Sequence, residues 1–196
     1  MMTKFVKISL MCVVILTIAL PVLSDESSEI KLTFSHKGNH YEMRAFFLCH
    51  AQSMDALKNM IYDYNHVKEV VKDAYSIEML RNDANSHELL YRYKGMLWAV
   101  DVAFERRLEN EKDIISFKMT KYTSSGTMPL PKIISSSGYY KISHQQNAFY
   151  IEYYQTTNTG PVIAQEIYLS QVKEDCLNYL KDLKKHIEDN KSTLQK

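Results

Sequence analysis

The chain has 196 residues, 45% of them hydrophobic and 24% charged, and its formal net charge is only +1 at pH 7. This composition is typical of one globular domain. The near balance of charge, with no basic run, excludes the electropositive surface that nucleic-acid binding requires, and the five glycines form neither a P-loop nor a dinucleotide-binding fingerprint.

The first 24 residues have the pattern of a secretory signal peptide. Lys4 and Lys7 give a basic start, and residues 8–20 are apolar apart from Ser9 and Thr17. An uncleaved anchor is the alternative, but this apolar run falls short of the roughly 20 residues needed to cross a bilayer. We therefore expect cleavage before Asp25, one mature domain over residues 25–196, and a periplasmic or secreted protein.

The mature chain should begin with a polar tail over residues 25–31, followed by a first strand over residues 41–49. Alternate apolar residues of that strand share one face. Ser53 is a candidate N-cap for a short helix, which residues 63–65 break before a second short helix. The apolar positions of these two helices are Met54, Leu57, Met60 and Ile61 in the first, and Val67, Val70 and Val71 in the second.

Four further strands are predicted over residues 75–80, 88–94, 98–104 and 115–119, separated by polar turns. Alternation assigns their inward faces. Residues 122–137 are rich in Ser, Gly, Thr and Pro and are predicted to form a long loop, with Met128 and Leu130 in an apolar patch. Loops of this length are uncommon unless they are functional, so we expect this one to act as a gate.

Two more strands, 138–144 and 148–155, lead to a long amphipathic helix opened by Pro161. Its apolar stripe consists of Leu169, Val172, Cys176, Leu180, Leu183 and Ile187. The opposite face is charged, with Lys173, Glu174, Asp175, Lys181, Lys184 and Lys185. A solvated helix of this kind needs a surface to cover, so the sequence predicts an α+β fold in which a curved antiparallel sheet wraps around the C-terminal helix.

Cys49 and Cys176 are the cysteines that remain after cleavage, and both fall on apolar faces. We favour two buried thiols, because free cysteine behaves as a small core residue. A disulfide is the alternative, since the sequence does not give the distance between their Cα atoms.

Several local motifs occur in the order in which they occur in one known superfamily. Residues 60–65 (MIYDYN) resemble its Leu-Asp-Tyr helix end, residues 98–100 (WAV) its Trp-Pro-Val step, and residues 138–142 (GYYKI) its Gly-x-Trp-x-Ile strand. Residues 158–161 (NTGP) stand where it has an Asp-Pro-Gly-Gly turn. The chain therefore resembles the START-like superfamily of helix-grip proteins, which also includes plant pollen allergens and polyketide cyclases. It departs from that pattern at Ala99, which replaces the proline, and in lacking the Arg-Asp pair after the tryptophan step.

A sheet wrapped around one helix leaves volume that aliphatic side chains do not readily fill, and 14 tyrosines are many for an ordinary core. The predicted cavity wall consists of Tyr91, Tyr93, Trp98, Phe117, Tyr140 and Tyr153. The alternative is that these rings fill the interior completely. Arg106 could meet a ligand head group or reach solvent at a strand end, and Gln155 could offer a hydrogen bond or lie at the rim.

The sequence shows no catalytic or metal-binding constellation. The seven histidines have no HExxH spacing, and His36 and His40 flank a turn. We therefore predict a monomeric protein without cofactor that binds or transfers a lipid or other hydrophobic small molecule and contacts membranes transiently. The alternative is a small-molecule enzyme of the cyclase or hydratase type, which would need an inward acid or histidine, and the register supplies only His87.

Overall fold

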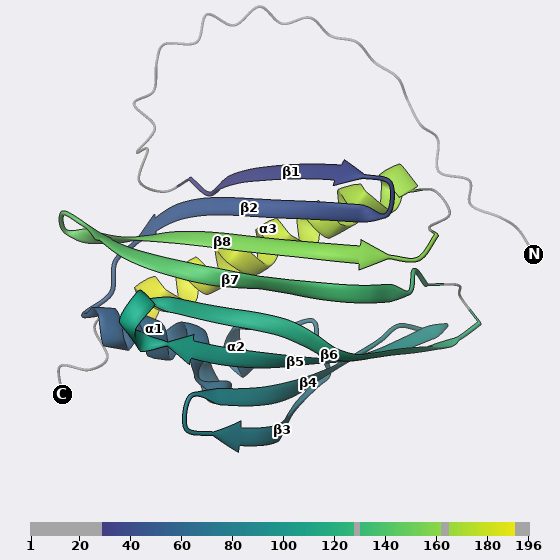
Figure 1. Cartoon of the computed structure of the whole chain (residues 1–196), viewed down its shortest axis with the longest axis horizontal. Helices are drawn as coiled ribbons and strands as arrows, with labels where there is room; N and C mark the ends of the chain where they lie inside the picture. Colours follow the sequence, from purple (N-terminus) through teal and green to yellow (C-terminus); the bar gives the residue numbers. More distant parts are fainter. Residues whose placement is uncertain (1–28, 128–129, 162–164, 191–196) are drawn as a thin grey trace, which may run out of the picture.

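The computed structural model describes residues 29–127, 130–161 and 165–190. One antiparallel sheet of eight strands, in the order β1-β2-β8-β7-β6-β5-β4-β3, curves around the long helix α3 (Figure 1). The predicted α+β architecture is therefore confirmed. The predicted signal peptide, residues 1–24, lies outside the described residues.

The elements follow one another as strands and helices with these bounds: β1 Lys31–Lys37, β2 His40–Cys49, α1 Met54–Tyr62, α2 Tyr64–Val70, β3 Ser76–Asp83, β4 Ser86–Lys94, β5 Trp98–Glu109, β6 Ile114–Gly126, β7 Ile133–Gln145, β8 Ala148–Thr159 and α3 Gln165–Asp189. Ser53 caps α1 by accepting a hydrogen bond from the backbone N–H of Ala56. Asp63 ends α1 and caps α2, so the predicted break between the two short helices is confirmed.

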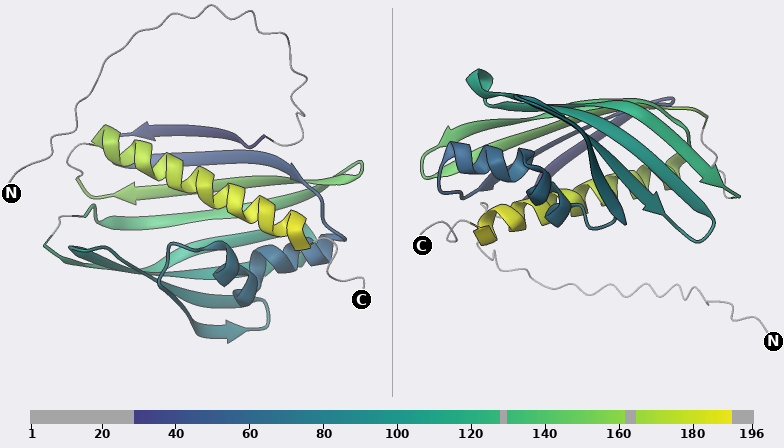
Figure 2. Two further views of the ribbon diagram at one scale, coloured as in Figure 1. Left: turned by 180° about the vertical axis from the view of Figure 1, so that it is seen from behind. Right: turned by 90° about the horizontal axis from the view of Figure 1, so that it is seen from below.

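Helix α3 lies across the concave face of the sheet, with α1 and α2 beside its C-terminal half (Figure 2). Five residues of the predicted stripe are buried, namely Leu169, Cys176, Leu180, Leu183 and Ile187, while Val172 is half-buried. Lys184, predicted to be solvated, is 8% exposed. Its aliphatic stem can cover apolar surface while the ammonium group, 3.9 Å from Glu188 Oε1, stays near the edge of the helix.

Strand β1 precedes the strand that was predicted to come first. Residues 31–37 pair with β2 along their whole length, where the sequence indicated a tail and then an unassigned stretch. Leu32 and Phe34 pack against the core, and Gly38, at φ +58°, makes the turn into β2. This edge strand was missed because its two inward apolar residues are too few to give a clear alternation.

The long loop predicted over residues 122–137 is also wrong. Strand β6 continues to Gly126 and β7 begins at Ile133, so only a short connection joins them. Most of the serines and threonines of this segment lie on these two strands, exposed except for the buried Ser136 and the half-buried Ser137. Pairing with β5 and β8 decides their conformation, and composition does not. Of the two predicted gate residues, Leu130 is half-buried in this connection and Met128 lies outside the described residues.

Strands β6 and β7 are paired over only part of their length. Their pairing covers only Ile114–Lys118 of β6, although both strands continue for several residues beyond it. The buried core falls into two clusters. One joins α1, α3 and Val70 of α2 to β2, β7, β8 and Ile115 of β6, and the second joins Val67 of α2 to β3, β4 and β5.

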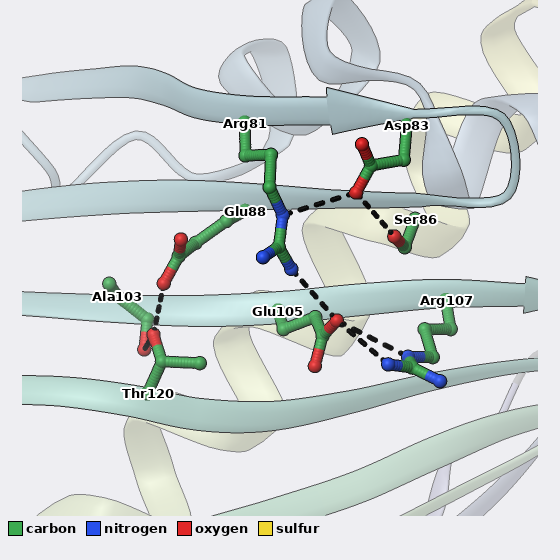
Figure 3. Close-up of polar contacts among 8 residues, drawn as sticks. All are labelled: Arg81, Asp83, Ser86, Glu88, Ala103, Glu105, Arg107 and Thr120. Atoms are coloured by element: carbon green, nitrogen blue, oxygen red, sulfur yellow. Dashed lines mark hydrogen bonds and ion pairs between the residues drawn. The ribbon is translucent and has the colours of Figure 1, made fainter.

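The convex face of β3, β4, β5 and β6 carries charged pairs (Figure 3). Arg81 and Arg107 both donate to Glu105 Oε1 at 3.0 Å, and Arg81 also pairs with Asp83. Exposed pairs of this kind contribute little stability, about 0–1 kcal/mol each. They mark this face as solvated.

Cys49 and Cys176 are both buried free thiols, as predicted. Burial raises the pKa of each thiol to about 12, so both are inert at neutral pH. None of the helices in the described part of the chain is long and apolar enough to cross a membrane.

Candidate functional site

A cavity of about 820 Å³ lies between the sheet, α2 and α3. Its volume falls within the range of about 300–1,000 Å³ that small-molecule pockets occupy. All eight residues predicted from the sequence line it, namely Tyr91, Tyr93, Trp98, Arg106, Phe117, Tyr140, Tyr153 and Gln155. The rings therefore do not fill the interior completely, and binding of a ligand by these residues stays a prediction.

One aromatic side chain from each of five neighbouring strands forms a continuous belt across the cavity wall. Tyr91 on β4 contacts Phe104 on β5 edge to face, and Phe104 contacts Phe117 on β6 at a centroid distance of 6.0 Å. Phe117 in turn contacts Tyr140 on β7 and Tyr153 on β8. Such a belt offers an extended apolar surface with hydroxyl groups at intervals.

Gly138 makes room for this belt where β6 meets β7. It pairs directly with Phe117, and an added Cβ would collide with the Phe117 ring and with the carbonyl oxygen of Tyr154. The glycine of the sequence motif GYYKI thus allows the ring of Phe117 to lie over the strand beside it.

Arg106 is the charged group of the cavity interior, and it is only 4% exposed. Its Nη2 donates to the carbonyl oxygen of Ile61 at 2.6 Å and its Nη1 to that of Tyr62 at 3.4 Å. Both carbonyls belong to the C-terminal turn of α1, where the helix dipole favours a cation. Within the described residues no carboxylate lies within ion-pair distance of the guanidinium.

The cavity tyrosines are neutral hydrogen-bonding groups. Burial raises the pKa of Tyr91 to about 12, although the nearby charge of Arg106 opposes the shift. Burial likewise raises the pKa of Tyr140, Tyr153 and Tyr179, and the Tyr140 and Tyr179 hydroxyl oxygens are 2.7 Å apart. At neutral pH these phenols can donate hydrogen bonds to a ligand, but they cannot act as bases.

Gln155 belongs to a polar cluster at the side of the cavity. Its amide nitrogen donates to Ser136 Oγ at 3.0 Å and to Thr157 Oγ1 at 3.3 Å, and its amide oxygen accepts from the Tyr153 hydroxyl. The side chain is therefore held in place by its neighbours, and it is not a free rim residue.

The cavity reaches solvent between the end of α2, the β4–β5 turn and α3. Its exposed lining residues there are Lys72, Asp73, Lys94, Asp175 and Asn178, which we call the mouth. Next to the mouth the β4–β5 turn exposes Met96 and Leu97, at 97% and 55%. The entrance of the cavity is therefore flanked by exposed apolar side chains.

Tyr179, which was not predicted as a site residue, lines the cavity from α3. Its position three residues after Cys176 lies beside the apolar stripe, and this spacing was the available signal. The ring is only partly buried, yet its hydroxyl group reaches Tyr140 across the cavity.

His87 faces the concave side, opposite Arg106 on the neighbouring strand, but it does not line the cavity. It is 3% exposed, its ring packs against that of Tyr62 at a tilt, with the centroids 4.3 Å apart, and its Nε2 has no hydrogen-bond partner among the described residues. Burial and the charge of Arg106 lower its pKa to about 4. The histidine that the enzymatic alternative required is thus a neutral packing residue.

His87 should make the protein less stable in mild acid. Its pKa in the folded state lies below the ordinary 6.5, so the neutral form favours folding, and the stability it gives is lost as pH falls from about 6.5 toward 4. The loss should reach about 3 kcal/mol. Urea unfolding at pH 7 and pH 4.5 gives the free energy of unfolding at each pH. The decrease between the two pH values should be smaller for His87→Phe than for the wild type. The exposed His144→Phe serves as the control, and equal losses in all three proteins would contradict the assignment.

No model of a known protein family matches the sequence, and no curated protein matches it. Solved structures do match. A STAR-related lipid transfer protein from Xanthomonas axonopodis is 16% identical with a TM-score of 0.63, over 84% of this chain and 96% of the other. The Zhui aromatase/cyclase from Streptomyces sp. R1128 is 8% identical with a TM-score of 0.61, over 79% and 98%. A START superfamily protein from Mycobacterium smegmatis is 8% identical with a TM-score of 0.58, over 76% and 97%. At these identities the likeness shows a shared fold.

Proposed function

We propose that this protein, which has the helix-grip fold of the START-like superfamily, is a non-enzymatic carrier of a hydrophobic ligand with one acidic head group. The buried Arg106 is the observation that carries this proposal. A guanidinium group without a carboxylate partner, at the side of an aromatic cavity, is suited to a ligand carboxylate or phosphate. The hydroxyl groups of Tyr91 and Tyr140 lie on the same wall and would add hydrogen bonds to the head group.

A cyclase or hydratase is the second candidate, because aromatase/cyclases share this fold. Such an enzyme needs a base near the reacting carbon. Among the described residues that line the cavity, the carboxylates are Asp73, Asp175 and Asp182, near the opening, and the interior offers neutral phenols and Arg106. This distribution favours binding over catalysis.

As part of the same proposal, and on the basis of the predicted secretory signal, this carrier would act in the periplasm or outside the cell. Transfer of the ligand would require transient contact with a membrane, for which Met96 and Leu97 beside the mouth are the candidate surface. The protein would act as a monomer, with the mouth free to meet the bilayer.

A vesicle-transfer assay tests the carrier function. The protein should move a fluorescent long-chain carboxylate from donor to acceptor vesicles, and the double variant Met96→Asp, Leu97→Asp should slow transfer at least fivefold while leaving probe affinity unchanged. Leu80→Asp, at an exposed leucine on β3, is the matched control and should leave the rate unchanged. Failure of the wild type to accelerate transfer would refute the carrier function. Equal slowing by the control would refute the membrane-contacting role of the β4–β5 turn.

A further inference from the structure

Two histidines and a glutamate meet between α2 and α3, away from the interior of the cavity. His66 Nδ1 lies 2.9 Å from His186 Nε2, and Glu69 Oε2 lies 3.6 Å from His186 Nδ1. One ligand atom from each of the three residues fits within 4.8 Å of the others. The two histidines are 120 positions apart in the sequence, so the fold alone brings them together.

From this geometry we infer a site for a divalent transition-metal ion of the Zn²⁺ class, held by His66, Glu69 and His186. Two imidazole nitrogens and a carboxylate are a donor set that binds Zn²⁺, with the remaining position open to solvent. Zn–N bonds of about 2.0–2.1 Å at angles near 90–110° separate two ligand nitrogens by about 2.9–3.4 Å, which is the separation found here. Imidazole donors favour Zn²⁺ over Mg²⁺ and Ca²⁺, which prefer oxygen.

The setting of the three side chains supports binding of an ion. Both histidines are partly buried, the His186 side chain being 11% exposed, whereas Glu69 is largely solvent-accessible and free to turn toward an ion. His66 and Glu69 stand three residues apart on α2, so they share one face of that helix. An ion can therefore enter from solvent and find two of its ligands already adjacent.

The ion would fasten α2 to α3 next to the mouth. Val67, Val70 and Val71 line the cavity from the α2 side, and Asp182 lines it from α3. An ion pair between Lys72 and Asp182, at 3.3 Å, already joins the same two segments. A metal bridge would hold them together more firmly, and so reduce the opening of the cavity on this side.

The test uses Co²⁺ and Zn²⁺ with the purified protein after chelator treatment. Co²⁺ should bind one to one, with visible absorption bands and no thiolate charge-transfer band, and Zn²⁺ should displace it. His66→Gln and Glu69→Gln should each weaken binding at least tenfold, and so should His186→Gln if it folds. His36→Gln is the matched control, because His36 is a surface histidine 3.9 Å from Glu166. No saturable binding below about 100 μM, or equal binding by all variants, would overturn the proposal.

Amide hydrogen exchange tests whether the ion links α2 to α3, and it needs no ligand in the cavity. Zn²⁺ should slow amide exchange in α2 and in the last two turns of α3 several-fold in the wild type, and this protection should be lost in His66→Gln. Protection that is the same in His66→Gln, or that spreads evenly over the whole sheet, would overturn the bridge. This readout is independent of the proposed carrier function, so either idea can fail alone.

Discussion

Replacing Arg106 with methionine is expected to weaken the binding of a long-chain carboxylate by about 10- to 150-fold. A hydrogen bond to a charged group contributes about 1.5–3 kcal/mol, and this substitution removes the cation while keeping an unbranched side chain of comparable length. The alcohol of the same chain length carries no negative charge that the Arg106 cation could bind. Its affinity should therefore change by no more than about threefold. Fluorescence displacement titrations with the two ligands give the comparison.

The neighbouring Arg107→Met provides the matched control. Arg107 lies on the opposite, convex face, where it donates to Glu105 (Figure 3), and its loss should change neither affinity. Arg106→Met also leaves the carbonyls of Ile61 and Tyr62 without their donor, so thermal unfolding is measured alongside. If a folded Arg106→Met protein loses affinity equally for acid and alcohol, or for neither, Arg106 does not bind a head group and serves only to cap α1.

Filling the cavity should abolish binding of both ligands. Val172 is a half-buried residue of α3 that lines the cavity, and Val172→Trp would place a large ring in the space that the ligand needs. We expect at least a 30-fold loss of affinity for carboxylate and alcohol alike. The unfolding temperature should be unchanged or higher, because the new ring gains contacts in space that was not filled.

Lys173→Trp puts the same ring one position along α3, on its exposed face, and should leave binding intact. A Val172→Trp protein that folds normally and still binds the probe with wild-type affinity would place the ligand somewhere other than this cavity. The pair of substitutions at residues 106 and 172 thus separates recognition of the head group from occupation of the cavity.

The sequence was most informative where alternation or helical spacing was long and clean. The inward face of β2 and the stripe of α3 are buried as the pattern predicted, and so the aromatic wall could be assigned before any contact was known. Strand β1 and the ends of β6 and β7 were missed. Their residues are polar or few, and pairing with neighbouring strands fixes their conformation.

The features of the site that the sequence did not predict depend on contacts between residues far apart in the chain. Burial of Arg106 depends on the end of α1, which lies 44 to 45 residues earlier in the chain, and no local pattern reveals that contact. The same holds for the proximity of His66 to His186. His87 was correctly predicted to point inward, but the sequence did not reveal that it packs against Tyr62 and does not line the cavity. Periodicity gives the face on which a residue lies, and only the packed fold gives its partner.

Native mass spectrometry of the protein purified from its own compartment tests the central claim, that the cavity holds a hydrophobic ligand with an acidic head group. The account predicts a folded protein with one bound molecule per chain, which organic extraction releases as a lipid-like compound that ionises as an anion. The Val172→Trp protein, prepared in parallel, should carry none. A wild-type protein that is folded by circular dichroism, but whose mass matches the bare chain and whose extract holds no such compound, would contradict it.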